Sequence, residues 1–236
     1  MKKSSIIIIA IVIIFSIFIG IKYINEKETE INKDALKFKE EYEILNGKTN
    51  KNNNKKYPLV KLSDDNVIKY SSYDEIFEIL NSGTGVIYLG FPECPWCRNL
   101  VPTLLSAAKE TEIETIYYLN IKEDRNLLVL NDKKEIITQN EGSKNYFKLV
   151  DILKDVLDDY ILTASDGEEV NTKTKRIYLP LVLFVKDGKL IGQHVGTVEN
   201  QEDPYIALTD RQTEELLVEL INLMSKVNGS ICDEKC

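Results

Sequence analysis

An apolar strand that leads directly into a pair of cysteines and a helix is the feature that most constrains this fold. Residues 85–90 have the composition of a buried strand, and a three-residue loop connects them to Cys94-Pro95-Trp96-Cys97. Leucine and alanine recur at helical spacing after this motif. Pro95 suits the first helical position, where its missing N–H leaves no hydrogen bond unmade. We therefore expect a strand, a short loop and a helix that begins at Pro95.

A cysteine at the start of a helix is well placed to react as a thiolate. Its sulfur lies near unpaired N–H groups and the positive end of the helix dipole, which stabilise the anion. We assign Cys94 as the attacking nucleophile and Cys97 as the resolving thiol, because the helix should expose the first and bury the second. Pro95 and Trp96 should tune the reduction potential, while Trp96 and Arg98 are candidates for partner recognition.

Two other interpretations of this dicysteine are open. A structural disulfide would close only a tiny loop and would stabilise little through chain entropy. A zinc site would need four thiolates, which Cys232 and Cys236 near the C-terminus could complete. The terminal pair has two further interpretations, a disulfide of its own or a second redox pair that relays electrons to Cys94 and Cys97. We favour a site without metal or cofactor.

The N-terminus carries an apolar run that predicts a membrane anchor. Residues 6–21 are apolar except for one serine and one glycine, and a lysine and a tyrosine directly afterwards suit the interface. No small-residue cleavage site follows, so we expect residues 1–24 to be an uncleaved transmembrane signal anchor. Lys2 and Lys3 precede the span, which favours a cytoplasmic N-terminus. The expected location is the cell membrane, single-pass, with the domain that carries Cys94 and Cys97 extracytoplasmic.

The remaining chain divides into a charged segment and a larger domain. Residues 25–57 predict an amphipathic helix and a polar, asparagine-rich linker. The narrow apolar seam of this helix could dock on the domain, pair with another chain or hold the domain off the bilayer. Residues 58–236 carry signals in the order β-α-β-α-β, an insertion at about 122–176, then β-β-α. This order predicts an α/β domain whose mixed sheet has helices on both faces.

Local signals place several boundaries inside this domain. Ser72-x-x-Glu75 is a capping box that should open a helix, and Lys186-Asp187-Gly188 should form the turn of a hairpin. The insertion is mostly polar and predicts one helix over about 144–160, while the last helix should cover about 213–227. His194, the only histidine, should lie at the surface of the second hairpin strand.

The charge balance argues against nucleic acid as a partner. The chain has 30 Lys and Arg residues against 38 Asp and Glu residues, a net charge of −8. No block of Lys and Arg interrupts this balance, and binding to polyphosphate requires many cationic contacts. We therefore expect partners of another class.

Residues 70–227, apart from the insertion, resemble the thioredoxin superfamily. The strand, the C-x-x-C motif and the helix look like its central element, and Pro102 falls where the family has a proline inside that helix. Residues 179–188 resemble the segment that holds the family's cis-proline. The resemblance implies a thioredoxin fold with a partly helical insertion before the cis-Pro strand. It also implies that Pro180 is cis and faces Cys94, while the backbone of Leu179 offers hydrogen bonds to a substrate.

The same resemblance implies a membrane-tethered thiol-disulfide oxidoreductase. Its expected partners are cysteine-containing secreted or envelope proteins and a membrane electron-transfer partner, and an anchored chain with this motif also looks like the bacteriocin transport accessory proteins. A redox-inert docking module of a secretion or membrane complex is the alternative. One position departs from the family, because Tyr88 stands where thioredoxins have a buried aspartate, and Glu93 is a possible substitute for that acid.

Overall fold

Five strands form a mixed central sheet in the order β1-β3-β2-β8-β9. The computed structural model describes residues 13–16, 22 and 33–229. Strands β1, β3 and β2 are parallel, β8 pairs antiparallel with β2, and β9 pairs antiparallel with β8. The mixed sheet predicted from the sequence is therefore confirmed. The strand bounds are β1 (Ile68–Tyr70), β2 (Gly85–Gly90), β3 (Ile116–Asn120), β8 (Leu181–Lys186) and β9 (Lys189–Val195).

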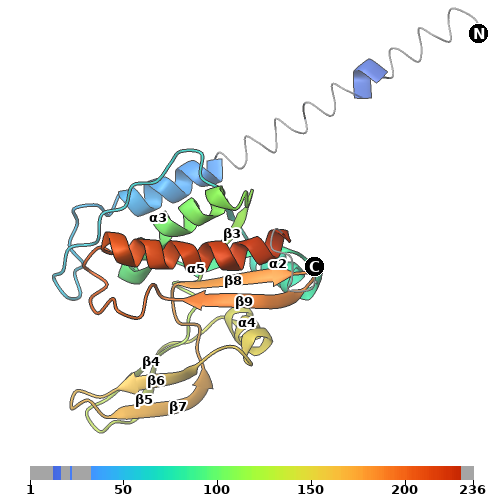
Figure 1. The fold of residues 1–236 in the computed structure, drawn as a ribbon. Helices are drawn as coiled ribbons and strands as arrows, with labels where there is room; N and C mark the ends of the chain where they lie inside the picture. The colour runs from blue at the N-terminus through green and yellow to red at the C-terminus, as the bar shows by residue number, and fades with distance from the viewer. Residues whose placement is uncertain (1–12, 17–21, 23–32, 230–236) are drawn as a thin grey trace, which may run out of the picture.

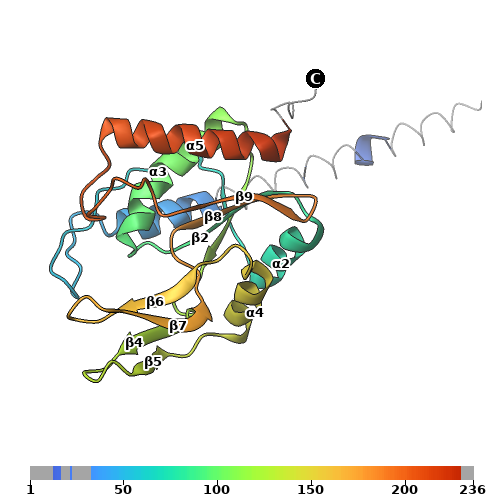
Figure 2. The ribbon, with the colours of Figure 1, turned by 60° about the horizontal axis from the view of Figure 1, so that its bottom comes forward.

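Helices cover both faces of this sheet, as Figures 1 and 2 show. Side chains alternate along β2, so Val86 and Tyr88 enter one apolar core while Ile87 and Leu89 enter the other. The first core lies under α3, α5 and a helix over residues 33–43, and the second lies against α2 and α4. A strand buried on both faces has to be apolar throughout, which explains the composition of β2. The helix bounds are α2 (Tyr73–Ser82), α3 (Pro95–Glu110), α4 (Lys144–Leu153) and α5 (Asp210–Asn228).

Most of the local start and stop signals act as predicted. Ser72 and Glu75 form the capping box of α2, and α3 begins at Pro95 with Cys94 as its N-cap. Gly188 follows Asp187 in the hairpin turn, and both have positive φ. Helix α5 begins three residues before the predicted start, because Thr209 and Gln212 form a second capping box.

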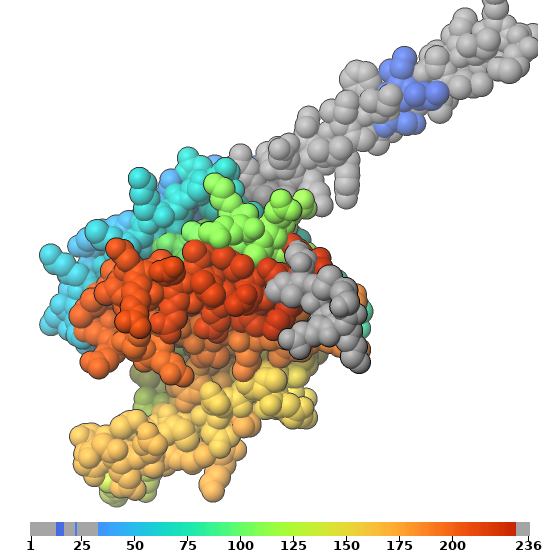
Figure 3. Space-filling view, in the orientation of Figure 1, coloured from blue at the N-terminus to red at the C-terminus, as the bar shows by residue number. Residues whose placement is uncertain are grey.

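The insertion contains more strand and less helix than the sequence predicts. Helix α4 ends at Leu153, and the remainder forms two hairpins, β4 (Leu127–Leu130) with β5 (Ile136–Asn140) and β6 (Asp159–Thr163) with β7 (Glu169–Lys175). These hairpins form a lobe beyond the central sheet (Figure 3). Most of their side chains are partly or fully exposed. They therefore lack the apolar alternation that reveals a half-buried strand.

The helix over residues 33–43 packs into the core of the domain. Ala35, Phe38 and Tyr42 on its seam are fully buried, and Phe38 lies 4.9 Å from Tyr118 of β3 between ring centroids. Of the three roles open for this seam, the structure shows docking on the domain. The polar run that follows is exposed, but Asn50 donates to the Tyr205 hydroxyl at 2.7 Å and ties it to the loop before α5.

The predicted anchor and the terminal cysteines fall largely beyond these ranges. Only residues 13–16 and 22 of the expected anchor, residues 1–24, belong to the described part. Among the described residues, no helix combines the length and the apolar character needed to cross a membrane. Cys232 and Cys236 both lie outside the described residues.

Removing a side chain from the seam of the first helix should destabilise the whole domain. Phe38→Ala deletes a fully buried ring, so we expect a loss of about 3–5 kcal/mol in the free energy of unfolding, measured by chemical denaturation. Leu36→Ala is the matched control, because Leu36 is 40% exposed on the same helix and should cost about 0.5 kcal/mol or less. Equal, small losses for both variants would show that the helix is not part of the core.

Candidate active site

Cys94 is the N-cap of α3, and its sulfur takes the place of a capping oxygen. The Cys94 Sγ accepts a hydrogen bond from the Cys97 N–H at 3.3 Å. The Cys94 N–H donates to the Phe91 carbonyl at 3.2 Å, which fixes the loop between β2 and the helix. Unpaired N–H groups in the first turn need acceptors, and a thiolate is a better acceptor than a thiol. The local geometry therefore favours the ionised form of Cys94.

The electrostatic surroundings lower the pKa of the Cys94 thiol. The largest cause is a hydrogen bond from the Cys97 thiol, which outweighs the opposing effect of burial. Hydrogen bonds from the Cys97 and Trp96 N–H groups and the positive charge of Arg125 lower the pKa further. Cys94 is only 7% exposed, so the expectation that the helix exposes it holds only in part. Only a small part of the Cys94 side chain is therefore accessible from solvent.

Cys97 has the opposite character. Its side chain is fully buried, and burial, followed by the hydrogen bond and charge of Cys94, raises the pKa of the Cys97 thiol. Both cysteines are free thiols in this structure. Of the two thiols, Cys94 is therefore the one that loses its proton at the lower pH.

Strand pairing brings Leu179 and Pro180 to Cys94. Leu89 of β2 pairs with Leu181 of β8, so the residues after β2 lie beside the residues before β8. The Leu179–Pro180 peptide is cis, which confirms the expectation for Pro180. The Leu179 carbonyl oxygen lies 4.0 Å from the Cys94 Sγ. The backbone of Leu179 thus borders the Cys94 sulfur.

Tyr88 lies beneath Cys97 and takes part in a buried pair of hydroxyl groups. The Tyr88 and Tyr42 hydroxyl oxygens are 2.7 Å apart, and both side chains are fully buried. A Cβ at Gly90 would overlap the Tyr88 hydroxyl, so glycine two residues along the same strand face leaves room for this ring. The hydroxyl of Tyr88 counters the rise in the pKa of Cys97. Glu93, the suggested substitute acid, instead pairs with Lys122 at 2.9 Å.

The expectation that Arg98 takes part in partner recognition is wrong. Its side chain is 1% exposed, because it lies between α3 and the N-terminal segment. Its Nη1 donates to the Tyr42 carbonyl at 2.7 Å, its Nε to the Pro58 carbonyl at 2.9 Å and its Nη2 to the Asn46 Oδ1 at 2.7 Å. These bonds hold the first helix and the chain after it against the active-site helix.

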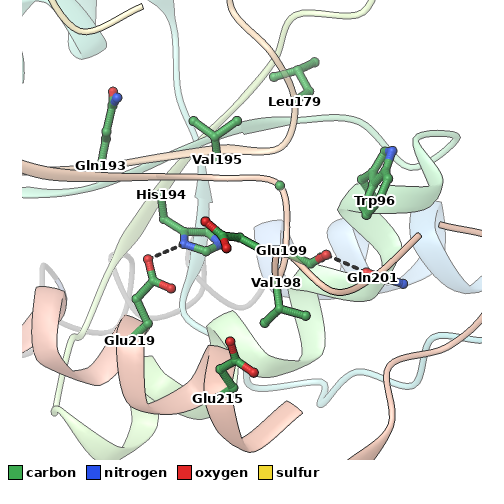
Figure 4. Close-up of a pocket in the computed structure, with 12 residues that line it drawn as sticks. Trp96, Leu179, Gln193, His194, Val195, Val198, Glu199, Gln201, Glu215 and Glu219 are labelled. Atoms are coloured by element: carbon green, nitrogen blue, oxygen red, sulfur yellow. Dashed lines mark hydrogen bonds and ion pairs between the residues drawn. The ribbon is translucent and has the colours of Figure 1, made fainter. Parts of the chain in front are cut away.

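A cleft of about 720 Å³ opens beside Trp96 and Leu179 (Figure 4). Three acidic side chains line it, Glu199, Glu215 and Glu219, and no described lysine or arginine does. His194 also lines the cleft, but it is 5% exposed, so its predicted surface position is wrong. Helix α5 covers this side of β9, and the His194 Nδ1 lies 2.8 Å from the Glu219 Oε1.

The zinc alternative depends on residues beyond the described part of the chain. Within that part, no group of three or more His, Cys, Asp or Glu residues is arranged to hold a metal ion. The four-thiolate site would need Cys232 and Cys236, which lie outside it.

The structure gathers most of the predicted site at one end of the sheet. The sequence did not identify the roles of Tyr42 or Arg125. Tyr42 reaches the site because the first helix docks on the domain, and Arg125 belongs to the insertion, which has no counterpart in the family resemblance. No protein-family model matches this chain, and no curated protein is significantly similar to it. The predicted residues that meet are Cys94, Pro95, Trp96, Cys97, Leu179 and Pro180.

The pKa of Cys94 should depend on the side chain at position 97. We expect alkylation of the reduced protein by iodoacetamide to follow a Cys94 pKa below the ordinary value of about 8.5, because the thiolate is the reactive form. Cys97→Ala removes the strongest hydrogen bond and should raise this pKa, while Cys97→Ser keeps a donor and should raise it less. Mass spectrometry of the Cys94 peptide separates its reaction from that of other cysteines. An unchanged pKa in both variants would contradict the assignment.

Removal of the Tyr88 hydroxyl should affect both stability and the second thiol. Tyr88→Phe leaves the buried Tyr42 hydroxyl without its partner and should cost about 1–3 kcal/mol of unfolding free energy. It should also raise the pKa of Cys97 and lengthen the lifetime of a mixed disulfide on Cys94. Tyr118→Phe is the control, because the Tyr118 hydroxyl is buried without a hydrogen-bond partner among the described residues. Identical behaviour of the two variants would rule out a role for Tyr88.

Proposed function

We propose that this protein is a thiol-disulfide oxidoreductase of the thioredoxin superfamily. The observation that carries the proposal is the contrast between two neighbouring thiols. Cys94 caps a helix and has a lowered pKa, whereas Cys97, one turn along, is fully buried and has a raised pKa. A pair of this kind divides the work of disulfide exchange between an attacking and a resolving sulfur.

The reaction proceeds in two exchange steps. The Cys94 thiolate attacks one sulfur of a client disulfide, forms a new S–S bond and releases the other client sulfur as a thiolate. Cys97 then loses its proton and attacks the Cys94 sulfur, which breaks the mixed disulfide and releases the second client thiolate. The client gains two electrons, and the Cys94–Cys97 pair becomes a disulfide. The reverse sequence oxidises a client dithiol.

The arrangement of the domain supports the superfamily assignment. The mixed sheet, the helices on its two faces and the placement of the C-x-x-C motif at the start of α3 are compatible with a thioredoxin-like fold. The cis Leu179–Pro180 peptide stands opposite Cys94, at the start of β8. The insertion of α4 and the two hairpins precedes this segment and enlarges the domain.

We also propose where the protein is located and which proteins are its clients. The apolar run of residues 6–21 supports a tether in the bacterial cell membrane with the domain outside the cytoplasm. The clients are then cysteine-containing secreted or envelope proteins, and a membrane electron-transfer partner sets the direction of exchange. Cys232 and Cys236 are close enough in sequence to form a second redox pair, which could pass electrons to Cys94 and Cys97.

A variant without the resolving thiol should trap its client. We expect Cys97→Ala to form a covalent adduct with a disulfide-containing protein such as oxidised insulin. The Cys94 thiolate attacks the insulin disulfide and releases one insulin thiolate, and the mixed disulfide on Cys94 then lacks its internal attacker. Mass spectrometry should locate the bond at Cys94, and dithiothreitol should release it. Cys94→Ala is the matched control and should form no adduct through Cys97, which is fully buried.

The same experiment separates the oxidoreductase from a redox-inert docking module. A docking module would bind its partner equally in the wild type, in Cys94→Ala and in Cys97→Ala. Absence of any adduct on Cys97→Ala, with disulfide exchange by the wild type also absent, would contradict the proposed function.

A further inference from the structure

Two arginines stand at the two ends of the insertion, next to the active site. Arg125 follows β3, and Arg176 precedes the segment that holds Leu179 and Pro180. The Arg125 guanidinium carbon lies 4.6 Å from the centroid of the Phe91 ring. The Arg176 guanidinium carbon lies 4.0 Å from the centroid of Tyr160 and 5.1 Å from that of Tyr178. Both cations are therefore held against aromatic rings.

These aromatic contacts place the two cations against the segments that border Cys94. Phe91, under Arg125, accepts the hydrogen bond of the Cys94 N–H at 3.2 Å. Tyr178, under Arg176, directly precedes Leu179, whose carbonyl oxygen is 4.0 Å from the Cys94 Sγ. The charge of Arg125 also helps to lower the pKa of Cys94. The insertion thus supplies positive charge close to the segments that border the nucleophile.

The rings that carry Arg176 are fixed by the hairpins of the insertion. The Tyr160 hydroxyl accepts from the Leu128 N–H at 3.1 Å and donates to the Leu128 carbonyl at 3.2 Å. The Tyr178 hydroxyl donates to the Asp159 carbonyl at 3.1 Å. Two strands that the sequence did not reveal, β4 and β6, therefore hold one of these cations in place, which reduces the conformational entropy lost when a ligand binds.

Neither arginine has an anionic partner in the described part of the chain. No carboxylate of a described residue lies within salt-bridge distance of Arg125 or Arg176, although several lysines are paired. The Arg125 Nε makes one long hydrogen bond, 3.4 Å to the Lys122 carbonyl. Burial and then the charge of Arg176 lower the pKa of the Arg125 guanidinium. Two neighbouring, partly buried cations without a counter-ion would be stabilised by a bound anion.

Arg98, the third arginine near the site, differs from these two because its hydrogen-bond donors have partners. Arg98 is more deeply buried, but its guanidinium donates to three carbonyls and one amide oxygen, so its donors are largely satisfied. It has a structural role. The cleft beside Trp96 carries three glutamates and would repel an anion. An anionic group that approaches Cys94 is therefore directed to Arg125 and Arg176.

We propose that Arg125 and Arg176 form a carboxylate-binding subsite beside Cys94, which selects disulfides that carry an acidic group next to the reacting sulfur. The planar guanidinium matches the geometry of a carboxylate and can bind it through two parallel hydrogen bonds. The carboxylate belongs either to an acidic residue of a client polypeptide or to a small acidic thiol. This inference rests on the proposed exchange reaction and adds a substrate preference to it.

Three small disulfides of equal reach test the subsite in the full-length reduced protein. They are 3,3′-dithiodipropionate, bis(2-hydroxyethyl) disulfide and cystamine, whose end groups are anionic, neutral and cationic. Rates of Cys94 oxidation are divided by the rates for free 2-mercaptoethanol, which removes differences in intrinsic reactivity. We expect the anionic disulfide to be favoured over the neutral one by roughly tenfold. The cationic disulfide should show no such gain.

Variants test whether the two arginines cause the preference for the anionic disulfide, and whether that preference can be lost without loss of disulfide exchange in general. Arg125→Gln with Arg176→Gln should abolish the roughly tenfold preference for dithiodipropionate over the neutral disulfide, compared at a pH where Cys94 is ionised in both proteins. Lys148→Gln is the matched control, because Lys148 is another cation of the insertion stacked on an aromatic ring, 4.0 Å from the centroid of Phe77. It should leave the preference unchanged.

A second set of substrates distinguishes the two sources of the carboxylate. Disulfide-linked peptides that differ only in Glu, Gln or Lys beside the cysteine should follow the same order if acidic polypeptides are the clients. A preference among the small disulfides alone would assign the subsite to a small acidic thiol. A wild-type protein that exchanges all disulfides without charge preference would overturn the subsite and leave the proposed function standing. A wild type that exchanges none would contradict the proposed function itself.

Discussion

The hydrogen bond from the Cys97 N–H to the Cys94 sulfur, 3.3 Å long, is the interaction on which the site depends. It exists because β2 ends four residues before Cys94 and α3 begins directly after it. The first turn of a helix has N–H groups without partners, and here a sulfur satisfies one of them. The same turn places Cys97 beneath Cys94 in the core. One short segment therefore creates both the thiol with the lowered pKa and the thiol with the raised pKa.

Buried polar groups connect the Cys94–Cys97 pair to the first helix and to the core of the domain. Arg98 joins α3 to the chain around Tyr42 and Asn46, and the Tyr42 hydroxyl meets Tyr88 below Cys97. The first helix therefore supports the two thiols as well as the core. A buried polar network of this kind is stable only when its members are paired. Loss of one hydrogen-bond partner should therefore also weaken the interactions of the other members.

The sequence allowed correct prediction where local chemistry decides the structure. The strand before Cys94, the start of α3 at Pro95 and the capping box of α2 all follow from short-range rules. The burial of His194 and the docking of the first helix depend on which faces meet in three dimensions, and no local pattern specifies that. The hairpins of the insertion are largely exposed and thus lack an apolar period. The positions of Arg125 and Arg176 depend on those hairpins, so they could not be predicted from the sequence either.

The most direct test of the central claim is the redox equilibrium of the Cys94–Cys97 pair. The full-length protein would be equilibrated with thiol and disulfide mixtures that cover about −120 to −270 mV, and peptide mapping would report the disulfide between these two residues. We predict a single reversible two-electron transition, in which the ratio of oxidised to reduced protein changes tenfold for about every 30 mV. Absence of a Cys94–Cys97 disulfide over the whole range, or a bond that forms irreversibly, would contradict the account.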